Sequence, residues 1–121
     1  MKRHLLCVLS ACVLAGCASG VGAFTAIGPA RPAKADNSRI DVFQTGLPQR
    51  PFERVALLDA HCESQWFSTP SFQSDVLPEL MNQARAAGCD AIIEIKEKSL
   101  MNPGNFETRA SHYTAIGVAY K

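Results

Sequence analysis

The stretch Asp75-Val-Leu-Pro-Glu-Leu-Met-Asn-Gln-Ala-Arg-Ala-Ala-Gly-Cys-Asp-Ala-Ile-Ile-Glu-Ile-Lys96 decides the fold of this chain. Ser74 or Asp75 can cap a helix at its start, and Gly88 is typical of a helix end. The apolar residues between these signals recur at helical spacing and share one face: Leu77, Leu80, Met81, Ala84 and Ala87. Asp90–Lys96 then reads as a strand. We therefore predict a helix that is followed directly by a strand.

The strand after the helix is expected to bury one face beneath it. Side chains alternate along a strand, so Ala91, Ile93 and Ile95 would point inward. Counting back by two places Cys89 on the same face. The helix and this strand would then share one apolar core.

Three further strands are predicted on either side of this unit. Arg39–Thr45 alternates, with Ile40 and Val42 on one side. Phe52–Cys62 is apolar enough to be a central strand. Thr108–Tyr120 is a long last strand. One face of that last strand is small enough for a helix to pack closely, and it carries Tyr113, Ala115, Gly117 and Ala119.

The predicted order is strand, strand, helix, strand, strand. This order indicates an α+β fold, a small sheet with one helix packed on one face. The helix between two strands implies a right-handed crossover if those strands are parallel neighbours. A domain of this size is near the lower limit of what folds without help, so oligomerisation or a disulfide would add stability.

The start of the chain has the parts of a bacterial export signal. Lys2 and Arg3 precede an apolar run from Leu5 to Leu14, which is shorter than the about 20 residues of a membrane-spanning helix. Leu14-Ala15-Gly16-Cys17 resembles the lipobox of bacterial lipoproteins. This resemblance implies cleavage before Cys17 and lipid attachment to Cys17, which would fix the protein to a membrane. The alternative is an ordinary signal cut near Ala18, which leaves a soluble periplasmic protein.

The domain organisation follows from this start. Residues 1–16 are predicted to be a lipoprotein signal peptide. Residues 17–37, rich in Ala, Gly, Pro and Ser, would be a lipid-anchored flexible tether, and residues 38–121 a small α+β periplasmic domain. Ala18 and Ser19 follow the cysteine, so the Asp of the inner-membrane retention signal is absent. The expected destination is the outer membrane, on its periplasmic face.

Charge and cysteine content exclude some functions. The whole chain has 12 Lys and Arg against 11 Asp and Glu, and removal of the signal leaves the charges nearly balanced. The composition therefore lacks the basic face that nucleic acid would demand, and no nucleic-acid partner is expected. Cys62 and Cys89 remain after the signal is removed and Cys17 is modified.

A family resemblance covers roughly residues 52–120. Gln83-Ala-Arg-Ala-Ala-Gly-Cys-Asp-Ala-Ile-Ile93 and Thr114-Ala-Ile-Gly-Val118 resemble the helix-to-strand turn and the last strand of YbjQ-like and RcsF-like domains. The resemblance implies a small α+β fold, and RcsF-like lipoproteins report envelope stress. It also implies that oligomeric rings and metal binding occur among relatives. RcsF-like domains have two disulfides, whereas this chain keeps only Cys62 and Cys89.

The candidate sites are few. Cys62 and Cys89 can form a disulfide in an oxidising compartment, or Cys89 can be a packed thiol in the core. Their positions before and after the helix place them at opposite ends of the sheet. His61 lies next to Cys62, but adjacent strand residues point to opposite faces, so we predict no metal site; His112 would join only through the fold.

Trp66 and Phe67 are candidate contacts for a partner, since Trp is enriched in binding hot spots; the alternative is that they cover the edge of a small core. We find no catalytic spacing and no cofactor motif, so an enzyme is not expected. The sequence predicts a non-enzymatic outer-membrane lipoprotein that binds another envelope protein for sensing or assembly. The alternative is a small-ligand or metal-binding module that forms a homo-oligomer.

Overall fold

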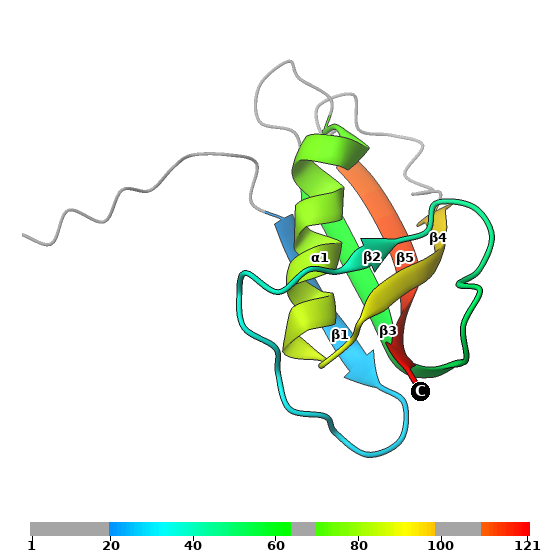
Figure 1. Ribbon diagram of the computed structural model, residues 1–121. Coiled ribbons are helices and arrows are strands. Elements are labelled where there is room, and N and C mark those ends of the chain that lie inside the picture. The colour runs from blue at the N-terminus through cyan, green and yellow to red at the C-terminus, as the bar shows by residue number, and fades with distance from the viewer. Residues whose placement is uncertain (1–19, 64–69, 99–109) are drawn as a thin grey trace, which may run out of the picture.

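The computed structural model describes residues 20–63, 70–98 and 110–121, which form one five-stranded mixed sheet with a helix packed on it (Figure 1). The predicted α+β class, with one helix on one face of a small sheet, is confirmed. None of the helices in these residues is long and apolar enough to cross a membrane. The elements are β1 (Gly20–Ala26), β2 (Asp41–Val42), β3 (Phe52–Glu63), a π-helical turn η1 (Phe72–Val76), α1 (Leu77–Ala86), β4 (Ala91–Lys98) and β5 (Ala110–Tyr120).

The strands lie in the order β1-β3-β5-β4-β2. β2 runs parallel to β4, and the other neighbouring pairs are antiparallel. Because β5 is antiparallel to both β3 and β4, these two strands run parallel with β5 inserted between them. The chain from β3 through α1 to β4 is therefore a split β-α-β unit. β3 and β4, which precede and follow α1 in the chain, are thus not direct neighbours in the sheet, as they would be in the simplest crossover.

The ends of α1 follow the sequence signals in part. Gly88 has φ 75 and ends the helical segment, as predicted. At the start, Ser74 and Asp75 lie within η1 rather than at the helix cap. The Asp75 carboxylate instead accepts a hydrogen bond from the backbone N–H of Ser71 at 2.7 Å. The π-helical turn thus extends the helical segment toward its N-terminus beyond the predicted cap.

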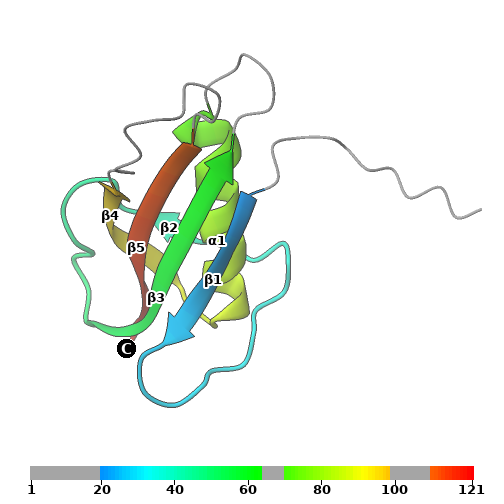
Figure 2. The same cartoon turned by 180° about the vertical axis from the view of Figure 1, so that it is seen from behind.

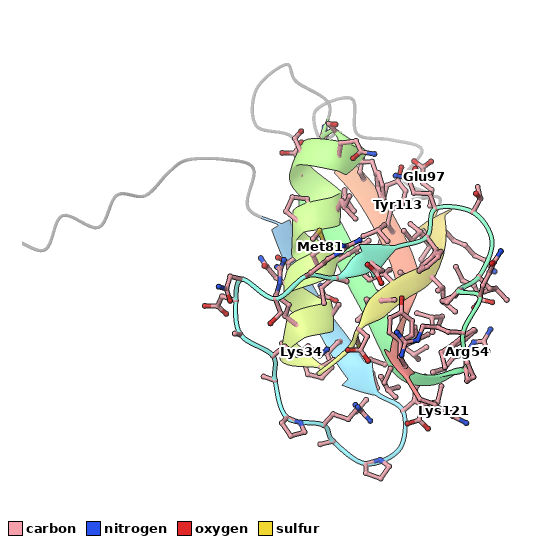
Figure 3. All side chains as sticks on the ribbon, viewed as in Figure 1. Lys34, Arg54, Met81, Glu97, Tyr113 and Lys121 are labelled. Carbon is pink, nitrogen blue, oxygen red and sulfur yellow. The ribbon has the colours of Figure 1, made fainter. Side chains whose placement is uncertain are left out.

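The main core lies between α1 and the sheet. Ala115 and Ala119 are buried in it and Tyr113 packs against it, while the Cys89 thiol fills the space that a side chain on Gly117 would need. This confirms the predicted small-residue face of β5. Figure 3 shows Met81 of α1 and Tyr113 of β5 on this side of the sheet. The buried members are Ile40, Val55, Ala56, Leu58, Ala60, Cys62, Val76, Leu80, Ala84, Ala87, Cys89, Ile92, Ala115 and Ala119.

The predicted inward face of β4 is wrong for Ala91 and Ile93, whereas Ile95 and Cys89 lie on the helix side as predicted. Ala91 and Ile93 are buried in a second, smaller cluster with Val118 on the other side of the sheet, whereas Ile92 joins the helix side. Both faces of this strand are buried, so burial alone does not distinguish them. Glu94 has φ 52, and the pairing with β5 shifts just after Ile93. This bulge changes the alternation and returns the next apolar residue to the helix side.

The predicted tether is also wrong for most of its length. Residues 20–26 form β1, which pairs antiparallel with β3 from Gly20 opposite Cys62 to Ala26 opposite Ala56. The folded domain therefore begins at Gly20, not at residue 38. After β1 the chain passes along α1 before it reaches β2, and the backbone N–H of Lys34 bonds to the carbonyl of Arg85 at 2.8 Å. β2 has two residues only, because just Asp41 and Val42 pair with β4.

Candidate binding surfaces

One side of the sheet has no helix on it among the described elements. We call the side of β1, β3 and β5 that faces away from α1 the open face. In Figure 2 these three strands stand in front of α1, and none of the other described elements passes over them. The second cluster, against which Phe43 and Phe52 pack, covers this side near the start of β3. The uncovered part is therefore the half toward the end of β3.

The open face carries a row of apolar groups. The strand register places Thr25, Leu57 and Ile116 side by side on β1, β3 and β5. Leu57 is 47% exposed, which is high for a leucine in the middle of a strand. A shallow groove crosses the face here, and its lining includes these three residues together with Asp59, Thr114 and Lys96. An apolar centre thus lies beside a polar row.

The next row along β3 and β5 on the same face contains a histidine pair. His61 and His112 face each other across β3 and β5, with ring centroids 6.0 Å apart. His112 donates from Nε2 to Oδ1 of Asp59 at 2.6 Å. This contact orients the His112 ring. The fold thus brings together residues from two distant segments of the chain.

The predicted separation of His61 from Cys62 is confirmed. Cys62 is buried in the main core, where its Sγ donates to the carbonyl of Asp75 at 3.3 Å, while His61 lies on the open face. Among residues 20–63, 70–98 and 110–121, no group of three or more His, Cys, Asp or Glu is arranged to hold a metal ion. His61, His112 and Asp59 lie together on the open face and form a polar patch.

Of the two alternatives left open for Cys62 and Cys89, the disulfide is not formed. Both thiols are free and buried. Cys62 pairs with Ser111 near the start of β5, whereas Cys89 lies against Gly117 near the end of that strand. The alternative prediction of a packed Cys89 thiol is the arrangement observed. Burial raises the pKa of the Cys89 thiol to about 11, and burial with the nearby Asp75 raises the pKa of Cys62.

A second surface lies between β1 and α1. We call it the edge groove, and it is lined by Gly22, Ala23, Phe24, Glu79, Asn82, Gln83 and Ala86. Phe24 is 37% exposed in it. Gln83 is buried and bonds to the backbone of Asp59: Oε1 accepts from the N–H at 3.0 Å, and Nε2 donates to the carbonyl at 2.8 Å. Its amide occupies the space that a side chain on Gly22 would need.

Sequence reasoning did not select Asp59 or Gln83. A signal existed for Gln83, since it falls on the apolar face of α1 between Leu80 and Ala84 and is the one polar residue there. For Asp59 the local sequence carries no signal, because its partner His112 is set by the strand register. Gln83 could thus have been selected from its position on the apolar face, whereas the assignment of Asp59 depends on the fold.

Three sequence-predicted residues lie outside the described residues. They are Cys17, the predicted lipid attachment point, and Trp66 and Phe67, the candidate partner contacts. Their roles stay predictions.

Comparison of the chain with known protein families, with curated proteins and with solved structures finds no match. The resemblance to YbjQ-like and RcsF-like domains therefore stays a prediction. What can be argued about function comes from the surfaces described above and from the sequence at the start of the chain.

Proposed function

We propose that this chain is a lipid-anchored protein of the outer membrane whose periplasmic domain binds another envelope protein without catalysing a reaction. The lipobox resemblance at Leu14–Cys17 supports the anchor, and the absence of Asp after Cys17 supports the outer membrane. Membrane confinement raises the effective concentration of the domain toward a partner on the same surface. A modest contact area is then sufficient for function.

The apolar row on the open face is the observation that carries this proposal. Leu57 is exposed at the centre of a sheet face, with Thr25 and Ile116 beside it. The two adjacent rows supply hydrogen-bonding groups, among them Asp59 and His112. An apolar centre with a polar rim is the usual composition of a protein-binding surface. β3 and β5 are each paired on both sides, and β1 is paired with β3. The surface is therefore pre-organised.

Photo-crosslinking in living cells tests the proposal. A photo-reactive amino acid replaces Leu57 in the full chain, with the native signal and Cys17 retained. We expect a discrete adduct with another envelope protein from position 57. The same amino acid at Gln73, which is exposed on η1 and lines neither the open face nor the groove between β1 and α1, is the matched control and should give no such adduct. The Cys17→Ser variant should give less adduct, because it cannot be anchored through this residue.

Two results would contradict the proposal. Equal adducts from positions 57 and 73 would show that the open face is not selective. An adduct of the chain with itself alone would favour the homo-oligomeric module instead.

A further inference from the structure

The outer edge of β1 is an unprotected strand edge. β1 is the first strand in the sheet order, so none of the described strands pairs with its outer side. Its sequence, Gly20-Val-Gly-Ala-Phe-Thr-Ala26, contains no charged residue and no proline, and its register with β3 is continuous. Proteins usually protect such an edge with charges, proline or a bulge. The opposite edge strand, β2, has only two residues and includes Asp41, so it is protected in this way.

The direction of the free backbone groups of β1 follows from its bonds to β3. The N–H of Ile27, which directly follows the strand, donates to the carbonyl of Val55 on β3 at 2.8 Å. Backbone groups alternate along an antiparallel strand, so the groups of Thr25 and Ala23 also face β3. Those of Phe24 and Gly22 therefore point to the outer edge. Two N–H and two C=O groups at the middle of the strand are thus directed away from β3.

The edge groove lies directly beside these groups. Its wall on the α1 side is formed by Glu79, Asn82 and Ala86, and Phe24 contributes an exposed aromatic ring from β1. Glu79 is the one ionisable residue in the lining, and its Oε1 accepts from Nε2 of Gln83 at 3.2 Å. A groove between a free strand edge and a helix fits an extended peptide, because the strand pairs with its main chain and the helix contacts its side chains.

We propose that the edge groove binds an extended segment of another polypeptide by strand addition to β1. Main-chain bonds would form with Gly22 and Phe24. An apolar side chain of the segment would pack on Phe24 and Ala86, and a lysine or arginine would complement the charge of Glu79. The proposal concerns a different surface from the open face, and it stands or falls independently of whether Leu57 contacts a partner.

The test starts from a phage-displayed library of random nine-residue peptides, selected on the full-length chain in detergent micelles. A selected peptide is synthesised with a fluorophore, and its affinity is measured by fluorescence anisotropy. Two variants form a matched pair: Phe24→Ala and Phe24→Pro both lose the ring, but only the proline variant loses the outward N–H. Proline is tolerated at an edge where the N–H faces solvent. We expect Phe24→Pro to bind at least tenfold more weakly than Phe24→Ala.

Backbone methylation of the peptide gives a readout that does not depend on how well the proline variant folds. N-methylation at alternate positions of the peptide should reduce affinity for the unaltered chain at least tenfold, while methylation at the intervening positions should have little effect. Glu79→Gln should weaken binding of peptides that contain lysine or arginine. The proposal is overturned if no peptide is enriched, if methylation has no alternating effect, or if Leu57→Glu abolishes binding while Phe24→Pro does not.

Discussion

At the scale of single residues, Gly117 and Cys89 illustrate how closely the main core is packed. Gly117 lies near the end of β5 on the face toward α1, and the Cys89 sulfur occupies the place of its missing side chain. Cys89 is fully buried and sits just after the glycine that ends the helical segment. The glycine in β5 thus makes room for a thiol from the loop that precedes the neighbouring strand β4.

Gly117→Ala should therefore destabilise the domain. The added methyl group would overlap the Cys89 sulfur, and overpacking of a core costs about 1–3 kcal/mol. Urea denaturation followed by circular dichroism measures the loss.

The effect depends on the thiol, so a double-mutant cycle provides the control. In a Cys89→Ala background the same Gly117→Ala change should cost clearly less, because the sulfur is gone. An equal loss of stability in both backgrounds would show that Cys89 is not the cause.

At the scale of secondary structure elements, Gln83 joins α1 to the strand pair β1 and β3. Its side-chain amide bonds to both backbone groups of Asp59, and it reaches them because Gly22 has no side chain. These groups of Asp59 face β1, so the helix takes part in the hydrogen bonding of the ladder. These hydrogen bonds explain why the polar residue Gln83 lies on the buried face of the helix.

Gln83→Leu should weaken this junction. The substitution keeps roughly the size of the side chain but removes the two hydrogen bonds from its amide to the backbone of Asp59, and each such bond contributes about 0.5–1.5 kcal/mol. We expect faster hydrogen exchange of the Asp59 amide and a lower melting temperature. Asn82→Leu, one position earlier on the exposed side of α1, is the control and should change neither. Unchanged exchange at Asp59 in Gln83→Leu would contradict the assignment.

The elements that could be predicted from the sequence are those with strong local patterns. β3, α1 and β5 were recognised because Phe52–Cys62 is apolar, Leu77–Ala87 has helical spacing and Thr108–Tyr120 has a small-residue face. β1 was missed because its segment consists largely of glycine and alanine and has few of the β-branched residues that indicate strands. Two prolines also follow it. It is a strand through its pairing with β3, which local sequence does not encode.

The candidate surfaces were less predictable than the elements. The placement of His61 and Cys62 on opposite faces followed from alternation alone. The pairing of His61 with His112, and the bond from His112 to Asp59, depend on a register between segments far apart in the chain. The inward face of β4 was mispredicted because Glu94 adopts a positive φ that interrupts the alternation. Such a bulge is set by contacts in the fold.

At the scale of the whole molecule, one polar network ties distant parts of the chain together. Asp90 forms an ion pair with Lys34 from the segment that passes along α1, and its other oxygen accepts from the N–H of Tyr120 at 2.8 Å. The hydroxyl of Tyr120 donates to Asp41 at 2.7 Å, next to β4. The network thus fastens the segment after β1, the start of β4 and the end of the chain to each other.

This network predicts a pH dependence of stability. Burial by itself raises the pKa of Asp90, but the hydrogen bonds from Lys34 and Tyr120 outweigh it and lower the pKa below its ordinary value. A carboxyl group whose pKa is lowered by folding stabilises the folded state above its unfolded pKa of about 4, and this stabilisation is lost as the pH falls through the folded pKa. The urea concentration at the midpoint of unfolding should therefore decrease as the pH is lowered from 5 to 3.

Asp90→Asn tests whether Asp90 contributes to that fall. The variant cannot be protonated at this position, so it should be less stable at pH 7 and lose less stability between pH 5 and pH 3. A loss of the same size in both proteins would assign the pH dependence to other carboxyl groups.

The early start of β1 has a consequence for how far the domain can travel from a bilayer. Gly20 pairs with Cys62, and Lys98 with His112, so the start of β1 lies at the same end of the sheet as the end of β4. With lipid on Cys17, as proposed, only Ala18 and Ser19 separate the anchor from that end, a span of about 10 Å at most. The sheet would then have a proximal pole against the lipid headgroups and a distal pole at Lys121. The domain would then stay within a thin layer next to the membrane surface, and a partner would have to reach it within that layer.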